Sequence, residues 1–112
     1  MDRLAATLVI KALDGLSARS VATAQNIANA GTAGYRPLRV SFEQALAGAA
    51  PLGPGAIAAV QPRLQTAGAG EGDLRLDLEL ATASSTALRY AALIEVLNRQ
   101  LQLDSLAATG NG

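Results

Sequence analysis

Apolar positions in the first part of the chain recur at alternating spacings of three and four residues. The members of this series are Ala6, Val9, Leu13, Leu16, Ser20, Thr23 and Ile27. The spacing is the heptad pattern of a helix that packs along its length on another helix. It predicts a helix over residues 3–30, about 40 Å long at the usual rise of about 1.5 Å per residue. Apolar residues off this line, such as Ile10 and Val21, make the apolar face wide enough for more than one neighbour.

A second series of the same kind follows near the end of the chain. Its members are Leu76, Leu80, Ala83, Ala87, Tyr90, Ile94, Leu97 and Leu101. Residues 73–80 alternate between charged and apolar, which is a strand pattern, yet Asp77 and Glu79 also suit the start of a helix, where negative charge is favoured. We expect an extended segment that becomes helical near residue 77, within a C-terminal helical region over residues 73–107.

The stretch between the two helices, residues 31–72, has a different composition. Phe42 is the expected anchor of a short helical or extended piece, and residues 57–60 resemble a brief strand. The run from Gly48 to Gly55 is rich in proline and glycine and is expected not to hold a helix. We therefore predict a turn and a flexible connector here. The predicted fold is all-α: two long terminal helices pairing as a coiled-coil-like hairpin, with a flexible Pro/Gly/Ala-rich middle segment.

Composition narrows the classes of function. The 112 residues include one Phe, two Tyr and no Trp, so large core-filling side chains are scarce. Nine basic and nine acidic residues cancel without clustering, which argues against a nucleic-acid partner. The absence of cysteine and histidine removes disulfides, thiol chemistry and the commonest metal ligands. The apolar run Leu8-Val9-Ile10 is too short for a signal-peptide core or a membrane span.

Candidate catalytic groups are weak. Asp73, Asp77 and Glu79 cluster, but without other ligands they are better explained as helix-start acids. The hydroxyls of residues 84–86 have no histidine anywhere in the chain to activate them. We therefore predict a protein that is not an enzyme and has no cofactor, no metal and no small-molecule substrate.

The first helix runs into Asn26-Ile27-Ala28-Asn29-Ala30-Gly31-Thr32-Ala33-Gly34-Tyr35-Arg36-Pro37. Asn29 and Gly31 suit a helix C-cap with φ above zero at Gly31, and Gly34 permits a second turn. Asn26 and Asn29 lie three residues apart on one helix face. Hydrogen bonds to a neighbouring subunit and capping of their own helix are equally consistent with that spacing.

This stretch resembles the N-terminal signature of the rod and hook family of bacterial flagellar axial proteins, roughly Asn-Ile-Ala-Asn-x-x-Thr-Pro-Gly-Tyr-Lys. The matching residues are Asn26, Ile27, Ala28, Asn29, Thr32, Gly34 and Tyr35, with Arg36 as the basic residue. The chain departs from the pattern at Gly31 and Ala33. Within the family, residues 79–81, 86–90, 92–93 and 97–101 are similar to the terminal helix of the proximal-rod FlgB type. The resemblance covers roughly residues 8–42 and 73–106.

The resemblance implies a structural subunit of the periplasm-spanning basal-body rod, exported by the flagellar type III apparatus without a cleavable signal peptide. Its implied partners are further copies of itself, other rod proteins and components of the basal body and export gate. The motif over residues 26–35 would be an assembly motif, and the helix seam would consist of Leu13, Leu16, Ile27, Leu80, Tyr90, Ile94, Leu97 and Leu101.

The residues alone leave two other classes open. A small cytoplasmic helical-hairpin adaptor or regulator that forms a homodimer would show the same heptads. An amphipathic protein of the membrane surface would share the wide apolar faces, but its polar face should be rich in lysine. The chain has a single lysine, Lys11, which disfavours the membrane reading.

Overall fold

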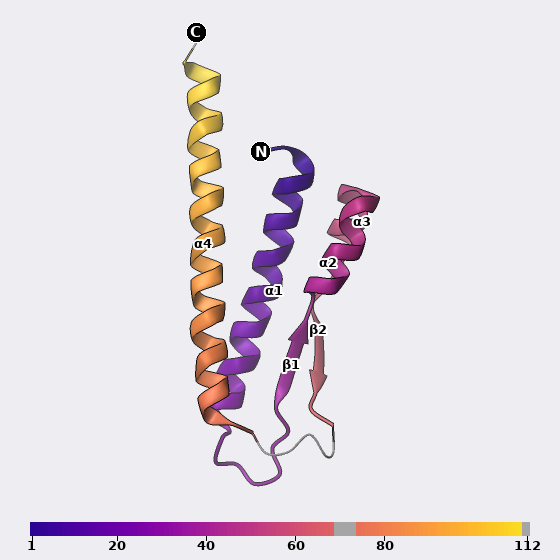
Figure 1. The fold of residues 1–112 in the computed structure, drawn as a ribbon, viewed down its shortest axis with the longest axis vertical. Helices are drawn as coiled ribbons and strands as arrows, with labels where there is room; N and C mark the ends of the chain where they lie inside the picture. Colours follow the sequence, from indigo (N-terminus) through magenta and orange to yellow (C-terminus); the bar gives the residue numbers. More distant parts are fainter. Residues whose placement is uncertain (69–73, 111–112) are drawn as a thin grey trace.

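A computed structural model of the chain describes residues 1–68 and 74–110. The molecule is elongated, with principal extents of 64 × 27 × 13 Å. Helix α1 (Arg3–Ala28) lies between helix α4 (Leu76–Thr109) on one side and a small middle module on the other (Figure 1). We define the middle module as residues 38–66. Because α1 and α4 run antiparallel along one another, the chain has the paired-helix arrangement that the two heptad series predict.

The ends of the long helices agree closely with the sequence prediction. Asp2 caps the start of α1, where its Oδ1 accepts a hydrogen bond from the Ala5 backbone N–H at 2.7 Å. The helix ends at Asn29, whose side-chain Nδ2 donates to the Gln25 carbonyl at 2.9 Å. At the start of α4, Arg75 is extended and the helix begins at Leu76, as expected for a segment that becomes helical near residue 77. Asp73 lies outside the described residues.

The prediction of a strictly all-α fold was wrong. Strands β1 (Leu38–Ser41) and β2 (Arg63–Thr66) form an antiparallel two-stranded sheet, in which Leu38 pairs with Thr66 and Ser41 with Arg63. The protein is therefore mostly helical with one small sheet.

The middle module also corrects the prediction of a flexible connector over residues 31–72. Helix α2 (Glu43–Ala49), a 3-10 helix (Ala50–Leu52) and helix α3 (Pro54–Ala58) connect the two strands. Pro51 and Pro54 lie in the first turns of their helices, where a missing N–H leaves no hydrogen bond unmade. Gly53 takes φ 102° at the junction. The prolines and glycines thus separate short helices instead of preventing them, and Ile57, expected in a strand, is helical and fully buried.

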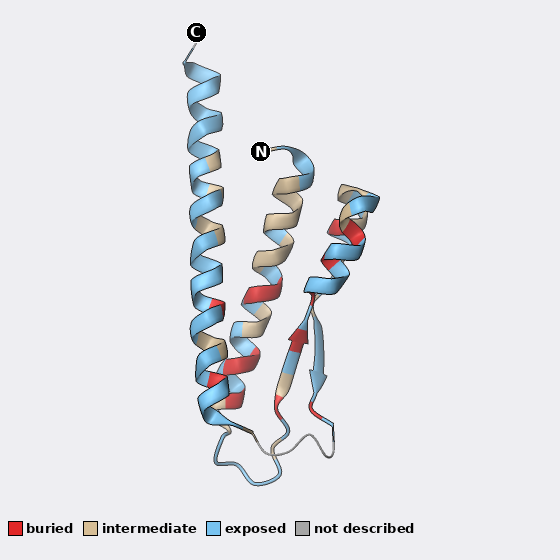
Figure 2. Ribbon diagram, in the orientation of Figure 1, coloured by how far each residue is buried: buried red, intermediate tan, exposed pale blue. Residues whose placement is uncertain are grey.

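The core lies where α1 faces the middle module, and its members are Leu16, Ala22, Val40, Phe42, Leu46, Ala49 and Ile57. Phe42 is the anchor expected from the sequence. Its ring packs directly on Gly15 of α1, where an added Cβ would lie 2.4 Å from the ring. Gly15 lowers helix propensity but makes room for this contact. Figure 2 shows buried residues in the second half of α1, in the middle module and in the first turns of α4, whereas the last turns of α4 are exposed.

Across residues 1–68 and 74–110, neither long helix is apolar over enough of its length to span a membrane.

Candidate assembly site

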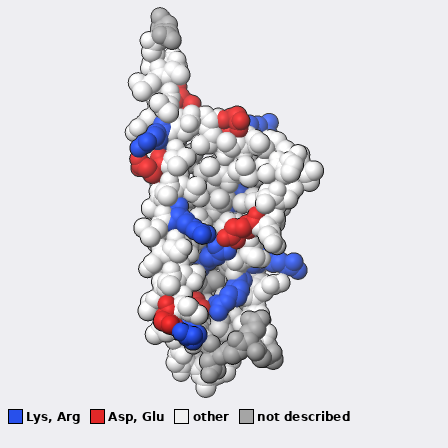
Figure 3. Space-filling view, in the orientation of Figure 1, with Lys and Arg blue, Asp and Glu red and all other residues white. Residues whose placement is uncertain are grey.

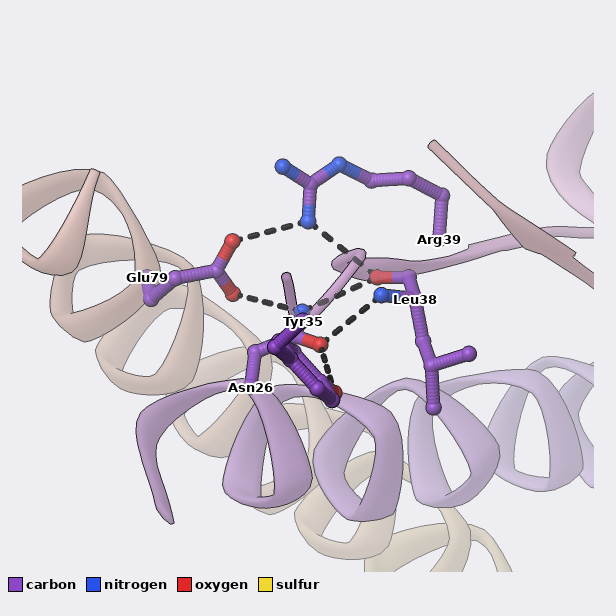
Figure 4. Close-up of polar contacts among 5 residues, drawn as sticks. All are labelled: Asn26, Tyr35, Leu38, Arg39 and Glu79. Carbon is purple, nitrogen blue, oxygen red and sulfur yellow. Dashed lines mark hydrogen bonds and ion pairs between the residues drawn. The ribbon is translucent and has the colours of Figure 1, made fainter. Parts of the chain in front are cut away.

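The side chain of Asn26 is the centre of a buried polar network at the end of α1 (Figure 4). Its Oδ1 accepts hydrogen bonds from the Tyr35 hydroxyl and from the Leu38 backbone N–H, both at 2.8 Å. Its Nδ2 donates to the Leu38 carbonyl at 2.9 Å and to Glu79 Oε2 at 3.0 Å. An amide has two donors and two acceptor sites, so every bonding position of Asn26 is used.

Glu79 connects this network to α4. Its side chain is buried, and its second oxygen, Oε1, accepts a hydrogen bond from Arg39 Nη1 at 2.7 Å. Arg39 also donates to the Leu38 carbonyl at 3.1 Å. The carboxylate lies in the first turn of α4, where the helix dipole favours negative charge. Glu79 is therefore more than the helix-start acid predicted from the sequence, because with Asn26 and Arg39 it fixes α4 to α1 and to β1.

The turn that follows α1 brings Tyr35 back to Asn26. Thr32 donates its backbone N–H to the Asn29 carbonyl at 2.9 Å and its hydroxyl to Asn29 Oδ1 at 3.2 Å. The Tyr35 backbone N–H in turn donates to the Thr32 carbonyl at 3.2 Å. Asn29 thus caps its own helix and Asn26 is buried. Capping, one of the two uses that the sequence left open, is thus found for Asn29, whereas Asn26 does not cap α1 and bonds Tyr35, Leu38 and Glu79 instead.

Gly34, and not Gly31, has the left-handed backbone of this turn. Among the described residues only Gly34 and Gly53 have positive φ, with φ 76° at Gly34. The expectation of φ above zero at Gly31 was wrong. Helix α1 ends at Asn29 without a left-handed residue, and the chain changes direction through the left-handed backbone of Gly34, three residues after Gly31. Ile27 is half-buried beside this turn, and Ala28 is exposed.

This assignment predicts unequal effects of two matched substitutions. Gly34→Ala should lower the free energy of unfolding by about 1 kcal/mol or more, because a Cβ is strained at positive φ. Gly31→Ala should change it by less than about 0.5 kcal/mol, since an added Cβ there meets nothing within 4 Å. Urea unfolding followed by circular dichroism measures both. Equal losses would contradict the assignment of the turn.

A second polar contact joins α1 to the middle module. Arg19 Nη1 and Nη2 donate to the two carboxylate oxygens of Glu43 at 2.7 and 2.8 Å, and Nη2 also donates to the Val40 carbonyl at 2.8 Å. The guanidinium carbon lies 4.8 Å from the centre of the Phe42 ring. The hydrogen bonds from Arg19 lower the pKa of Glu43 from 4.5 to about 2. Arg19 therefore fixes α2 beside α1.

The lowered pKa of Glu43 predicts a pH dependence of stability. A carboxylate with a lowered folded-state pKa stabilises the fold above its unfolded-state pKa, and this contribution is lost as pH falls through the folded-state value. We expect Glu43→Gln to cost about 1 kcal/mol at pH 7, a small figure because solvent screens the half-exposed carboxylate. The difference from the unsubstituted chain should shrink between pH 4.5 and about 2. Unfolding curves across this range test it, and a constant difference would contradict it.

The predicted helix seam is only partly buried within the chain. On α1, Leu16 is buried, and Leu13 and Ile27 are half-buried. On α4, the line facing α1 includes Glu79, Thr86 and Leu93, each one residue before a predicted seam position. Three of the predicted seam positions are more exposed than Glu79 and Thr86: Leu80 is 50% exposed, Tyr90 39% and Leu101 56%. Ile94 and Leu97 are half-buried, as Leu93 is.

Large apolar side chains are exposed on every side of α4. They are Leu76, Leu78, Leu80, Leu88, Tyr90, Val96, Leu101, Leu103 and Leu106. All residues from 101 to 110 are exposed. A groove of about 310 Å³ follows the seam, between Leu16, Ser17 and Ser20 of α1 and Thr86, Ala87, Tyr90 and Ala91 of α4. Exposed apolar side chains in this number on one helix are typical of a contact surface, so α4 is a candidate assembly surface.

The chain matches no protein-family model, no curated protein and no solved structure. The resemblance to the flagellar rod and hook family thus remains a prediction from the sequence motifs. In the parts of the chain that the structure describes, no three Asp or Glu side chains come together as a possible metal site.

Proposed function

We propose that the chain is a structural subunit of the bacterial flagellar basal-body rod, of the proximal-rod FlgB type, which assembles through α1 and α4 after type III export. The observation that carries the proposal is the offset on α4. The buried residues Glu79 and Thr86 each lie one residue before a seam position, and Leu80, Tyr90 and Leu101 of the seam stay at least one-third exposed, so they are open to another molecule.

Energetics support an assembly role for this seam. Burying one large apolar side chain contributes about 1.5 to 3 kcal/mol, and three such side chains on the seam are at least one-third exposed in the single chain. Every residue from 101 to 110, in the last turns of α4, is exposed in the single chain. Neighbouring helices in a rod would supply that burial, and a contact between unlike surfaces of identical subunits builds an open filament when its rotation does not close into a ring.

The motif over residues 26–35 supports the same proposal in an indirect way. Its polar side chains hold the end of α1, β1 and the start of α4 together. The motif would therefore set the register of the two terminal helices and so place the seam correctly for the next subunit. In this account the motif prepares the assembly surface, and α4 provides it.

The alternative is a cytoplasmic helical-hairpin adaptor that forms a homodimer through the same seam. The two functions differ in the size of the assemblies they form: a rod subunit keeps adding copies, whereas the adaptor stops at a dimer. For the rod subunit we expect sedimentation velocity to show a monomer at low concentration and a broad series of larger species as concentration rises. A sharp species that stays at the mass of a dimer over a hundredfold concentration range would favour the adaptor and contradict the rod proposal.

A further inference from the structure

A groove of about 570 Å³ lies between α4 and β1, apart from the seam. Three of its lining residues are Arg19, Arg39 and Arg89. We name it the arginine groove. Figure 3 shows basic side chains gathered in the hollow between α4 and the middle module. The lining also includes the apolar residues Leu38, Val40 and Leu78.

Two of the three arginines are engaged within the chain, and the third is nearly free. Arg19 bonds both oxygens of Glu43, and Arg39 bonds the buried Glu79. The contact of Arg89 among the described residues is an ion pair at 3.9 Å with the same Glu43 oxygen that Arg19 Nη1 already bonds at 2.7 Å. The Arg89 side chain is 63% exposed. The groove therefore presents guanidinium donors that a carboxylate from outside would satisfy.

The outward face of α1 carries a carboxylate and apolar side chains that could pair with the arginines and apolar residues of the groove. Ile10 is 52% exposed and Val21 59% exposed. Between them, at helical spacing, lie the exposed residues Asp14 and Ser17. Within residues 1–68 and 74–110, Asp14 has neither a side-chain hydrogen bond nor an ion pair. This face thus carries two exposed apolar side chains, with Ser17 and the unpaired carboxylate of Asp14 between them.

We propose that the outward face of α1 from a second copy of this chain docks in the arginine groove, with its Asp14 carboxylate bonded to the Arg89 guanidinium. Val21 of that copy, two turns after Asp14, then contacts the apolar part of the groove. The inference rests on the self-association in the proposed function and adds a second contact surface to it. Because the two surfaces differ, the contact is head-to-tail and can repeat from copy to copy.

Site-specific cross-linking tests the proposal directly, because the chain has no cysteine of its own. Ser17→Cys places a thiol beside Asp14 on α1, and Ser85→Cys places one in the groove, one turn before Arg89. Ser84→Cys is the matched control, since Ser84 is exposed beside Ser85 but does not line the groove. When isotope-labelled Ser17→Cys chains are mixed with Ser85→Cys chains and oxidised, we expect at least about five times more cross-link than with Ser84→Cys chains.

Charge exchange then tests the ion pair itself. Asp14→Arg in the Ser17→Cys chain, or Arg89→Asp in the Ser85→Cys chain, should each lower the cross-link yield about fivefold, and the two together should restore it. Circular dichroism checks that each variant folds. Equal cross-linking to residues 84 and 85, or no response to charge exchange, would overturn the docking. If larger species still form in either case, the proposed function stands without this contact.

Discussion

Asn26→Ala is expected to lower the free energy of unfolding by about 4 kcal/mol. The substitution removes four hydrogen bonds at once. It leaves the buried Glu79 with Arg39 as its remaining side-chain partner, and it removes the Asn26 acceptor of the Leu38 backbone N–H, while the Leu38 carbonyl keeps its bond from Arg39. Removing one partner of a buried charge is among the most destabilising changes a protein undergoes. Chemical unfolding of the full chain measures the loss.

Asn29→Ala is the matched control for that experiment. Asn29 is on the same chain segment three residues later, and its Nδ2 donates one hydrogen bond, to the Gln25 carbonyl. It should cost about 1 kcal/mol or less, because the site is close to water and the helix end can be solvated. Comparable small losses for the two asparagines would contradict the view that Asn26 connects α1, β1 and α4.

The second large effect is expected on assembly and not on folding. Leu101→Asp should leave the helix content and unfolding of the free subunit unchanged, since Leu101 is 56% exposed and lies among the exposed last turns of α4. In an assembled rod the same change places a charge in a helix–helix contact, at a cost of several kcal/mol. We expect a strain with this variant to secrete the subunit, build no rod beyond it and lose motility.

Gln102→Asp introduces the same charge at the next residue, which is exposed and off the seam. It should assemble normally. Leu101 suits this test better than Leu97, because Leu97 is half-buried within the chain and a charge there would affect folding as well. Normal motility with Leu101→Asp, or equal loss with Gln102→Asp, would refute the assignment of the seam.

The long helices could be predicted because their apolar residues repeat over many turns. The sequence did not allow us to predict which side of α4 faces α1. The heptad series counts apolar residues, whereas the line that faces α1 includes the polar residues Glu79 and Thr86, both 4% exposed. Glu79 is buried because Asn26 and Arg39 bond it, and these residues are 53 and 40 positions away in the chain. No local spacing indicates such a contact.

The middle module was hidden from pattern analysis for another reason. Each strand has four residues, and every residue of β2 is exposed, so no alternation of apolar and polar residues marks it. Gly53 and Pro54 read as breakers, but they begin the helix that buries Ile57. Phe42 was the one clear signal, because it is the only phenylalanine and fills the space above Gly15.

The motif over residues 26–35 was located correctly as the end of α1, yet its internal chemistry was not evident. The bond from the Tyr35 hydroxyl to Asn26 depends on the reversal at Gly34. In a sequence, two polar residues nine positions apart carry no sign that they meet. The structure shows that residues 26–35 form a turn whose side chains connect the end of α1 to β1 and to the start of α4.

The most direct test of the central claim is whether the chain is a stable component of the flagellar basal body. Basal bodies freed of filament and membrane would be purified from the host bacterium, and the chain would be quantified by mass spectrometry against known rod and ring proteins. We expect the chain to remain in this fraction in fixed proportion to the other rod subunits and to be lost from it in the Leu101→Asp strain. Recovery of the chain only from the soluble fraction, as a discrete homodimer, would contradict the rod proposal.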